Sequence, residues 1–151
     1  MKKIVFDSDG LIKLVKSGIF KKIQQEIFIS EEVYQETVVA GKKGFHDDAQ
    51  IIEQYIEEKK IIVKKNKTTK NIYGLGKGEA SAFSLFEEIQ ADAIISDDRK
   101  FLAVLEQENI PFIVPTEVIV ALAVKRRITK IEAAEALLKI KNLRSKFPLH
   151  N

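Results

Sequence analysis

Short apolar runs that end abruptly in polar residues alternate along this chain with stretches of helical periodicity. The first run, Ile4-Val5-Phe6, leads straight into Asp7, and a later run, Ala93-Ile94-Ile95-Ser96, ends in Asp97 and Asp98. Unbroken apolar runs bounded in this way are typical of parallel strands that are buried on both faces. Strands are therefore predicted over residues 3–7, 27–29, 61–63, 93–96 and 112–114.

Apolar residues spaced three or four positions apart predict helices over residues 11–15, 20–24, 31–40, 46–59, 80–89, 101–105, 116–123 and 130–140. The candidate helix caps are Asp9, Ser30, Thr116 and Thr129, and Thr129 forms a capping-box pattern with Glu132. Strands that alternate with helices form a parallel sheet covered on both faces. The predicted fold is a single α/β domain over residues 1–151, a three-layer α/β/α sandwich whose central parallel sheet has about four to five strands.

Composition restricts the chemistry that this chain can perform. Its 151 residues suit one domain with a full core. The absence of cysteine and the presence of only two histidines, His46 and His150, exclude cysteine nucleophiles and the usual zinc sites. An enzyme of this composition is expected to use carboxylates with Mg²⁺ or Mn²⁺. No apolar run approaches the roughly 20 residues that span a bilayer, and the start does not resemble a signal peptide, so a cytoplasmic protein is expected.

Positive charges are concentrated in three segments, although the net charge is only +3. Seven lysines and no acid lie between Lys59 and Lys77, a second cluster covers 125–130, and a third comprises Lys139, Lys141, Arg144 and Lys146. Any one of them is equally well explained as a solvated surface. Three together favour a polyanionic partner, because phosphate neutralisation with counterion release is the main sequence-independent source of nucleic-acid affinity.

Acidic side chains follow two of the predicted strands, at Asp7 and at Asp97-Asp98. Carboxylates packed together at one sheet edge repel each other unless a cation intervenes, so this pattern predicts a metal site. Glu79 opens a helix after Gly76-Lys77-Gly78 and is a third candidate, with a first-turn acid that complements the helix dipole as the alternative. Glu36 is a fourth candidate, and Glu32, one turn earlier, is an equal competitor by spacing alone.

Four short motifs follow one another along the chain: Asp7-Ser8-x-Gly10, Val33-x-x-Glu36, Leu75-Gly76-x-Gly78-Glu79 and Ser96-Asp97-Asp98-Arg99. Together they resemble the PIN-domain nucleases, and in particular their VapC-like prokaryotic branch. The resemblance covers residues 3 to about 146 in family order. It implies a catalytic cluster of Asp7, Glu36, Glu79 and Asp98 that binds one or two Mg²⁺ or Mn²⁺ ions. Asp97 is a further possible metal ligand, and Ser8, Asp9 and Ser96 are expected to support the cluster.

This resemblance also implies an activity and partners. Members of the family hydrolyse RNA phosphodiesters with a metal-activated water, often act as toxins that an antitoxin protein neutralises, and form homodimers. The residues expected to contact nucleic acid are Lys64, Lys65, Lys67, Lys70, Lys77, Arg99, Lys125, Arg126 and Arg127. Asp9 departs from the family pattern, where many members have a small hydroxyl or amide residue, and a helix cap is its expected role.

Two other functions compete with a nuclease. Asp7-Ser8-Asp9-Gly10 is also close to the motif of haloacid-dehalogenase-like phosphatases, in which the two acids act as nucleophile and acid/base. Leu11 stands where that motif has threonine, and Glu36 and Glu79 would then have no role. The second competitor is a nucleic-acid-binding module that has kept the fold and lost turnover. RNA cleavage, phosphomonoester cleavage and binding without cleavage distinguish the three.

Overall fold

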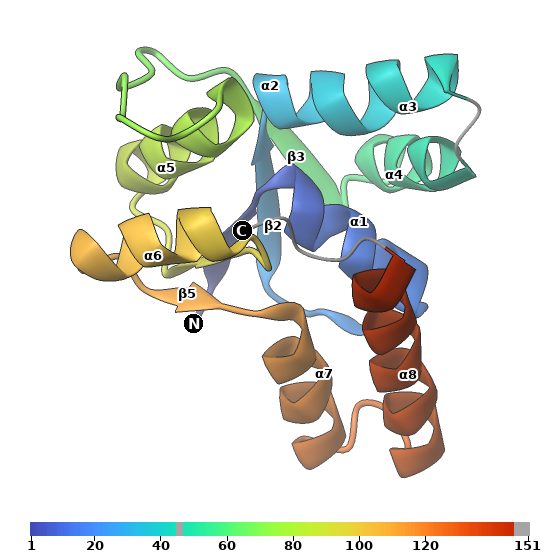
Figure 1. Ribbon diagram of the computed structural model, residues 1–151. Coiled ribbons are helices and arrows are strands. Elements are labelled where there is room, and N and C mark those ends of the chain that lie inside the picture. The colour runs from blue at the N-terminus through green and yellow to red at the C-terminus, as the bar shows by residue number, and fades with distance from the viewer. Residues whose placement is uncertain (45–46, 147–151) are drawn as a thin grey trace.

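The computed structural model describes residues 1–44 and 47–146, with side chains up to Arg144, and contains one five-stranded parallel sheet (Figure 1). The strands are β1 (Lys3–Phe6), β2 (Glu26–Ser30), β3 (Ile61–Lys64), β4 (Ala93–Ile95) and β5 (Phe112–Ile113). Their order in space is β3-β2-β1-β4-β5, so β1 lies at the centre. Because all neighbours are parallel, every strand ends at one edge of the sheet, the carboxyl edge, and begins at the other, the amino edge.

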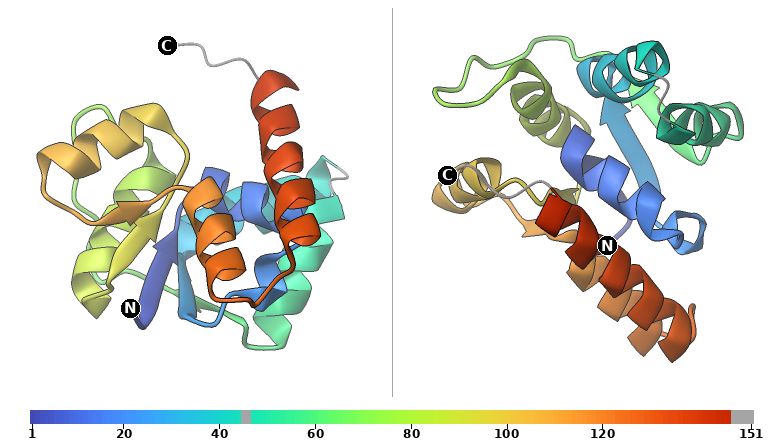
Figure 2. Two further views of the ribbon diagram at one scale, coloured as in Figure 1. Left: turned by 90° about the horizontal axis from the view of Figure 1, so that it is seen from below. Right: turned by 45° about the vertical axis from the view of Figure 1, so that its right-hand side comes forward.

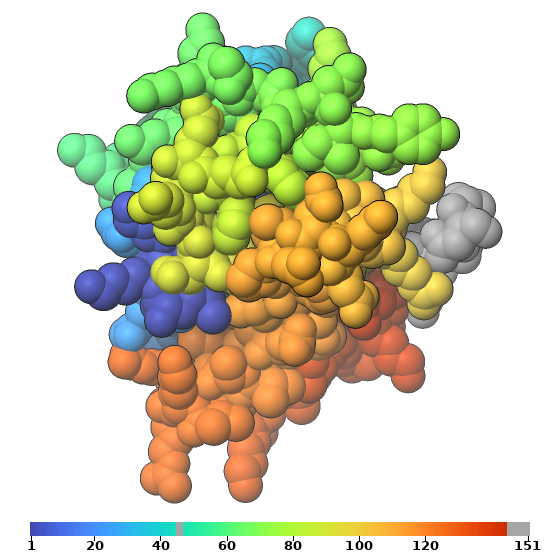
Figure 3. All heavy atoms as spheres, turned by 90° about the vertical axis from the view of Figure 1, so that its left-hand side faces the viewer, coloured from blue at the N-terminus to red at the C-terminus, as the bar shows by residue number. Residues whose placement is uncertain are grey.

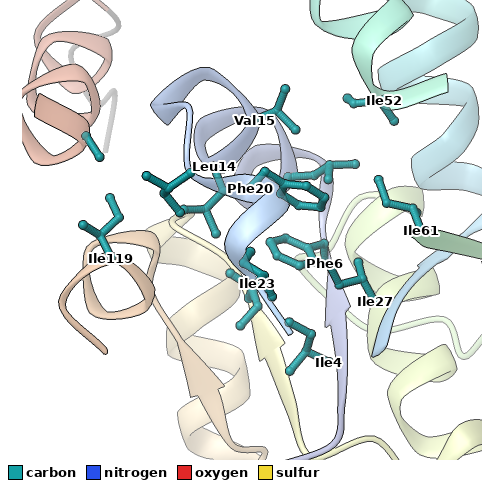
Figure 4. Close-up of a cluster of buried hydrophobic side chains, with 14 of the residues drawn as sticks. Ile4, Phe6, Leu14, Val15, Phe20, Ile23, Ile27, Ile52, Ile61 and Ile119 are labelled. Atoms are coloured by element: carbon teal, nitrogen blue, oxygen red, sulfur yellow. The ribbon is translucent and has the colours of Figure 1, made fainter. Parts of the chain in front are cut away.

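The larger hydrophobic core lies on one face of this sheet (Figure 4). Phe6 points from β1 into this core and packs against Phe20, with the ring centroids 5.7 Å apart. Leu11 and Leu14 belong to the buried stripe that the sequence predicts for the first helix. The elements that cover this face are α1 (Ser8–Ser17), the 3-10 turn η1 (Phe20–Lys22), α4 (Asp47–Glu57), α7 (Pro115–Val124) and α8 (Lys130–Lys146).

Two helices, α5 (Lys77–Ile89) and α6 (Arg99–Gln107), cover the opposite face (Figure 1). Val5 and Ile94 point to this side and join Phe83 and Phe101 in a second core. Successive strand residues alternate between the two faces, as the period of a strand requires. The predicted three-layer α/β/α sandwich with a parallel sheet is confirmed.

A continuous helical run crosses the carboxyl edge above β2 (Figure 1). It consists of α2 (Glu31–Tyr34), the π-helical turn η2 (Gln35–Val39) and α3 (Ala40–Lys43). Ser30 caps its start, because the Ser30 Oγ accepts a hydrogen bond of 3.1 Å from the N–H of Val33. The cap is as predicted, whereas the run continues to Lys43, beyond the predicted end near residue 40.

α7 and α8 form a helical hairpin whose two helices lie side by side (Figure 2). The predicted capping box is present: the N–H of Thr129 donates to Glu132 Oε1 at 2.8 Å, and the N–H of Glu132 donates to Thr129 Oγ1 at 3.0 Å. The chain enters α7 at the carboxyl edge, turns at the amino edge and returns along α8. Among residues 1–44 and 47–146, no helix has the length and apolarity that crossing a membrane requires.

Two predicted helix caps are wrong. Asp7, not Asp9, is the N-cap of α1, because the Asp7 Oδ1 accepts from the N–H of Gly10 at 2.8 Å. Thr116 is also not a cap, since α7 begins at Pro115, whose missing N–H suits the first helical position. The helix predicted over 46–59 is observed as α4, while His46, His150 and the Lys146 side chain lie outside the described residues.

Candidate metal centre

Asp7 lies at the carboxyl edge, between the end of the central strand β1 and the start of α1. Its side chain is buried, with Gly10 N–H donating to Oδ1 and the Ser96 hydroxyl donating to Oδ2 at 2.5 Å. Gly10 is needed for this arrangement, because a Cβ on it would stand 2.6 Å from the carbonyl oxygen of Ile95. α1 therefore packs directly against β4, and the Asp7 carboxylate is fixed in one orientation.

The environment of Asp7 opposes its ionisation. Burial raises the pKa of this carboxyl to about 8, and the charges of Asp9 and Glu79 add to the effect. The hydrogen bonds from Ser96 and Gly10 lower the pKa but compensate only in part. Among the described residues, no Lys or Arg forms an ion pair with Asp7. A buried carboxyl with a strongly raised pKa at a strand end is a feature of functional sites.

Glu36 reaches the same place from the π-helical turn η2. Its Oε1 accepts a hydrogen bond from the Ser8 hydroxyl at the start of α1. Gly78 makes room for it, because a Cβ at residue 78 would collide with the Glu36 carboxylate. π-helical turns are rare and occur frequently at functional sites, because the extra residue changes the direction of the side chains.

Glu32, the competitor of Glu36, points elsewhere. It lines a separate groove with residues 69–71 and 75–77, and its Oε2 is buried without a hydrogen-bond partner among the described residues. The geometry therefore favours Glu36 as the member of the acidic cluster.

Glu79 is held at the start of α5, where its Oε1 accepts from the N–H of Gly76 at 3.1 Å. Glu79 is thus the first-turn acid that the sequence allowed as an alternative, and it also accepts a capping hydrogen bond. Burial raises the pKa of Glu79, and the charges of Asp98 and Glu36 raise it further, so the three carboxylates are close enough to repel. Glu79 therefore combines a capping bond with membership of the acidic cluster.

Asp98 begins α6 and is tied to Asp7 through Ser96. The Asp98 Oδ1 accepts from the N–H of Phe101 at 3.0 Å, and the Asp98 N–H donates to Ser96 Oγ at 3.1 Å. Because the same Ser96 hydroxyl donates to Asp7, one fully buried serine couples the ends of β1 and β4. Ser96 therefore occupies the supporting position expected for it.

These side chains surround one cavity, the acid cavity, lined by Asp7, Ser8, Asp9, Glu36, Gly76, Gly78 and Glu79. Asp98 adjoins it through Glu79. The potential ligands are oxygen atoms with an excess of negative charge, which suits a hard divalent cation such as Mg²⁺ or Mn²⁺. In the described part of the chain, no three carboxylates are already arranged as a ligand set. The donor chemistry fits a metal ion, and occupancy would have to draw the carboxylates together.

Asp97, which is predicted as a possible metal ligand, lies beside this cavity and forms ion pairs with basic residues. Both of its oxygens accept from the Arg144 guanidinium at 2.8 Å, and Lys13 Nζ lies 2.9 Å from Oδ2. Burial acts to raise the pKa of Asp97, but the hydrogen bonds from Arg144 and Lys13 outweigh it and hold the pKa below its usual value. We therefore assign Asp97 to an ion-pair network instead of the ligand set.

Lys13 and Arg144 are the residues of this network that the sequence analysis did not place at the site. Lys13 also pairs with Asp9 at 3.3 Å, one helical turn earlier. Burial raises the pKa of Asp9 in spite of this pairing. The i,i+4 spacing of Asp9 and Lys13 was a readable signal, whereas the contact of Arg144 with Asp97 joins residues 47 positions apart and has no local signature.

The predicted phosphate-binding cations fall into two groups at opposite edges of the sheet. In Figure 3 the green segment around residues 64–77 lies at the top and the orange segment around residues 125–127 lies at the bottom. Lys64, Lys65 and Lys67 are exposed near the end of β3, and Lys77 and Arg99 are exposed in the first turns of α5 and α6, so these five lie on the carboxyl side with the acids. Lys70 belongs to the same segment but pairs with Glu87 at 2.7 Å.

Lys125, Arg126 and Arg127 lie at the other end, in the turn between α7 and α8. Lys125 shares a groove with Met1, Gln25 and Glu26 at the amino edge. The sheet separates these three cations from the acid cavity, so any contact of theirs with nucleic acid would be made away from the acids.

Comparisons with known proteins agree with this architecture. The family model DUF3368, described as a PIN domain, matches residues 3–147. A search of curated proteins found no match. Among solved structures, the chain is similar to a PilT N-terminus domain protein from the hyperthermophilic archaeon Sulfolobus solfataricus P2, with a TM-score of 0.58 and 15% identity, covering 79% of this chain and 92% of the other. At that identity the similarity concerns the fold alone.

Proposed function

Because the chain belongs to the PIN-domain family and has its nuclease-type fold, we propose that it is an endoribonuclease that depends on Mg²⁺ or Mn²⁺. The observation that carries the proposal is the buried Asp7, oriented by Ser96 and Gly10 and surrounded by other acids. Keeping such a group unneutralised opposes folding, so a function that needs it is the simplest reason for its presence.

The residues proposed to hold the cation are Asp7, Glu36, Glu79 and Asp98. When bound, the cation would neutralise the incoming phosphodiester and lower the pKa of the attacking water. Ser96 and the N–H of Gly10 keep the Asp7 carboxylate in place, and Ser8 positions Glu36 at the rim of the cavity. Lys13 and Arg144 neutralise Asp97, which reduces the repulsion at the edge without occupying the cavity.

The test is cleavage of a labelled single-stranded RNA by purified protein. Cleavage is expected with Mn²⁺ or Mg²⁺ and should stop with EDTA. Asp7→Asn should reduce the rate by about three orders of magnitude, as loss of a key electrostatic group in an active site does. Asp92→Asn is the matched control, because Asp92 lies at the amino edge, where it accepts from the N–H groups of Lys2 and Lys3.

Three outcomes would contradict the proposal. Undiminished cleavage by Asp7→Asn would show that another site, or a contaminant, is responsible. Hydrolysis of p-nitrophenyl phosphate without RNA cleavage would favour the phosphatase that the Asp7-Ser8-Asp9-Gly10 motif also resembles. Tight RNA binding without cleavage would favour a binding module that has lost turnover.

A toxin role is a further step of the same proposal. If the nuclease acts on cellular RNA without restraint, induced expression should stop growth, and expression of Asp7→Asn should not. Co-expression with an antitoxin protein that occupies the acid cavity should restore growth.

A further inference from the structure

The segment between β3 and α5, residues 65–76, lies at the carboxyl edge with the acids and is named here the lysine loop (Figure 1). It starts where β3 ends and finishes at Gly76, whose N–H is bound by Glu79. Because β3 is parallel to the central strand, the loop begins and ends on the same side of the sheet as Asp7.

Hydrogen bonds attach this loop to α5 along its length. Asn66 Nδ2 donates to the carbonyl of Ser81 at 2.9 Å, and the N–H of Lys67 donates to Glu88 at 2.7 Å. Further along, the N–H of Lys70 donates to Ser84 Oγ at 2.9 Å. The loop therefore has a fixed backbone path, although it contains no helix or strand.

Its last part is a tight turn that presents Tyr73 to solvent. Ile72 and Leu75, on either side of Tyr73, pack against the second core. The N–H of Leu75 donates to the carbonyl of Ile72 at 3.1 Å, and Gly74 has φ +85°, as the third position of a type II turn requires. Tyr73 itself is 100% exposed. A fully exposed aromatic ring on an anchored turn has no packing role in this chain.

A groove lies beside this turn, and Leu75 is the residue of the turn that lines it. It is lined by Glu32, Thr69, Lys70, Asn71, Gly76 and Lys77, and it shares Gly76 with the acid cavity. The exposed cations Lys67 and Lys77 stand on the loop and at the start of α5. The charged residues that line the groove are Lys70, Lys77 and Glu32, so a nucleic-acid strand in it would have its phosphates beside the two lysines and would reach the acid cavity at Gly76.

We propose that Tyr73 is a base-stacking residue that selects single-stranded RNA for the acid cavity. An unpaired base can lie on its ring, while the paired and stacked bases of a duplex have no free face to offer. The lysines of the loop would hold the neighbouring phosphates without reading sequence. This inference rests on the proposed function, and it assigns the discrimination between single and double strands to a side chain outside the acidic cluster.

The experiment measures binding of a labelled single-stranded RNA to the Asp7→Asn protein, which prevents cleavage. Adding Tyr73→Ala should weaken binding by about tenfold, which is typical of losing one base–aromatic contact, and Tyr73→Phe should retain most of the affinity. Tyr73→Leu is the matched apolar variant and should behave like Tyr73→Ala, because it lacks a π face. Val124→Ala, at another exposed apolar residue, should have no effect.

Two further readouts separate stacking from charge. Tyr73→Ala should leave the slope of log affinity against log salt unchanged, whereas Lys67→Ala should reduce it by about 0.7, the value for one phosphate contact on a single strand. An RNA with one abasic position at the stacking site should bind about tenfold more weakly to the parent, and Tyr73→Ala should then cost nothing more.

Failure of this inference is distinguishable from failure of the proposed function. If the wild-type protein cleaves RNA and Tyr73→Ala binds and cleaves as well as the parent, Tyr73 has no such role and the nuclease assignment stands. Equal losses for Tyr73→Ala and Tyr73→Phe would also overturn stacking, because they point to the hydroxyl. If RNA is neither bound nor cut by any variant, both proposals fall.

Discussion

Both edges of the sheet carry an aspartate, but the two aspartates differ in burial and in the direction of their pKa shift. At the amino edge, Asp92 is exposed, and backbone N–H groups of Lys3 and Lys2 lower its pKa. At the carboxyl edge, Asp7 is buried, and burial raises its pKa to about 8. Both are aspartates next to neighbouring strands: Asp92 precedes β4 and Asp7 follows β1. The residue type therefore does not explain their different pKa values.

The difference follows from the direction of the strands. In a parallel sheet all strands end, and the helices that follow them begin, at the same edge. The acids that start α1, α5 and α6 are therefore brought together at the carboxyl edge, where each raises the cost of ionising the next. At the amino edge helices end, and the three cations of the α7–α8 turn lie there.

The largest effect expected from this contrast is on stability. In metal-free protein, unfolded Asp7 ionises near its ordinary pKa of 3.8 and folded Asp7 only near 8, so the unfolded state binds fewer protons between these values. Wild-type stability should therefore fall as pH rises, by about 4 kcal/mol from pH 4 to pH 7 for this group. Asp7→Asn should remove that part of the decline and be the more stable protein at pH 7.

Urea unfolding in EDTA at several pH values measures this difference. Asp92→Asn provides the control at the amino edge and should keep the wild-type decline. Parallel stability curves for wild type and Asp7→Asn would mean that burial of Asp7 does not oppose its ionisation.

A smaller effect, on RNA binding, is expected when the cations of the two edges are replaced in turn. Replacing Lys64, Lys65 and Lys67 with glutamine should weaken single-stranded RNA binding by about tenfold at moderate salt and reduce the salt slope by about 2. The same change at Lys125, Arg126 and Arg127 removes equal charge from the amino edge and should have little effect. Equal losses from the two triple variants would show that binding depends on total charge and not on the carboxyl edge.

The smallest effect concerns Asp97, an acid of the carboxyl edge that is paired with both Arg144 and Lys13. Arg144→Gln should lower the free energy of unfolding by about 1 kcal/mol at pH 7, a value discounted because the Arg144 side chain is 38% exposed. The folded pKa of Asp97 is lowered, so this stabilisation is present above the ordinary value of 3.8 and is lost as pH falls through the folded pKa. Thermal unfolding at pH 7 and at a series of pH values below 3.8 should therefore show the deficit shrinking as the pH falls.

Local patterns were sufficient for most of the fold. Apolar runs located the five strands, and the Thr129–Glu132 box marked the start of α8 because both of its hydrogen bonds are made within four residues. They failed where two residues could play the same local part. Asp7 and Asp9 can each cap α1 by spacing, and the structure shows Asp7 in the capping position, with Gly10 packed against Ile95 of β4.

The sequence by itself determined the strand ends, the acids attached to them and the set of oxygen ligands, because each depends on neighbours in the chain. The tertiary structure decided which acids are neutralised. Arg144 reaches Asp97 only because α8 returns to the carboxyl edge, and Glu36 reaches the acid cavity because η2 lies over Gly78. The tertiary structure also places residues 125–127 at the amino edge, because the helix that follows β5 runs back along the sheet. The charged residues can be read from the sequence, whereas the ion pairs that neutralise Asp97 join residues that are far apart along the chain.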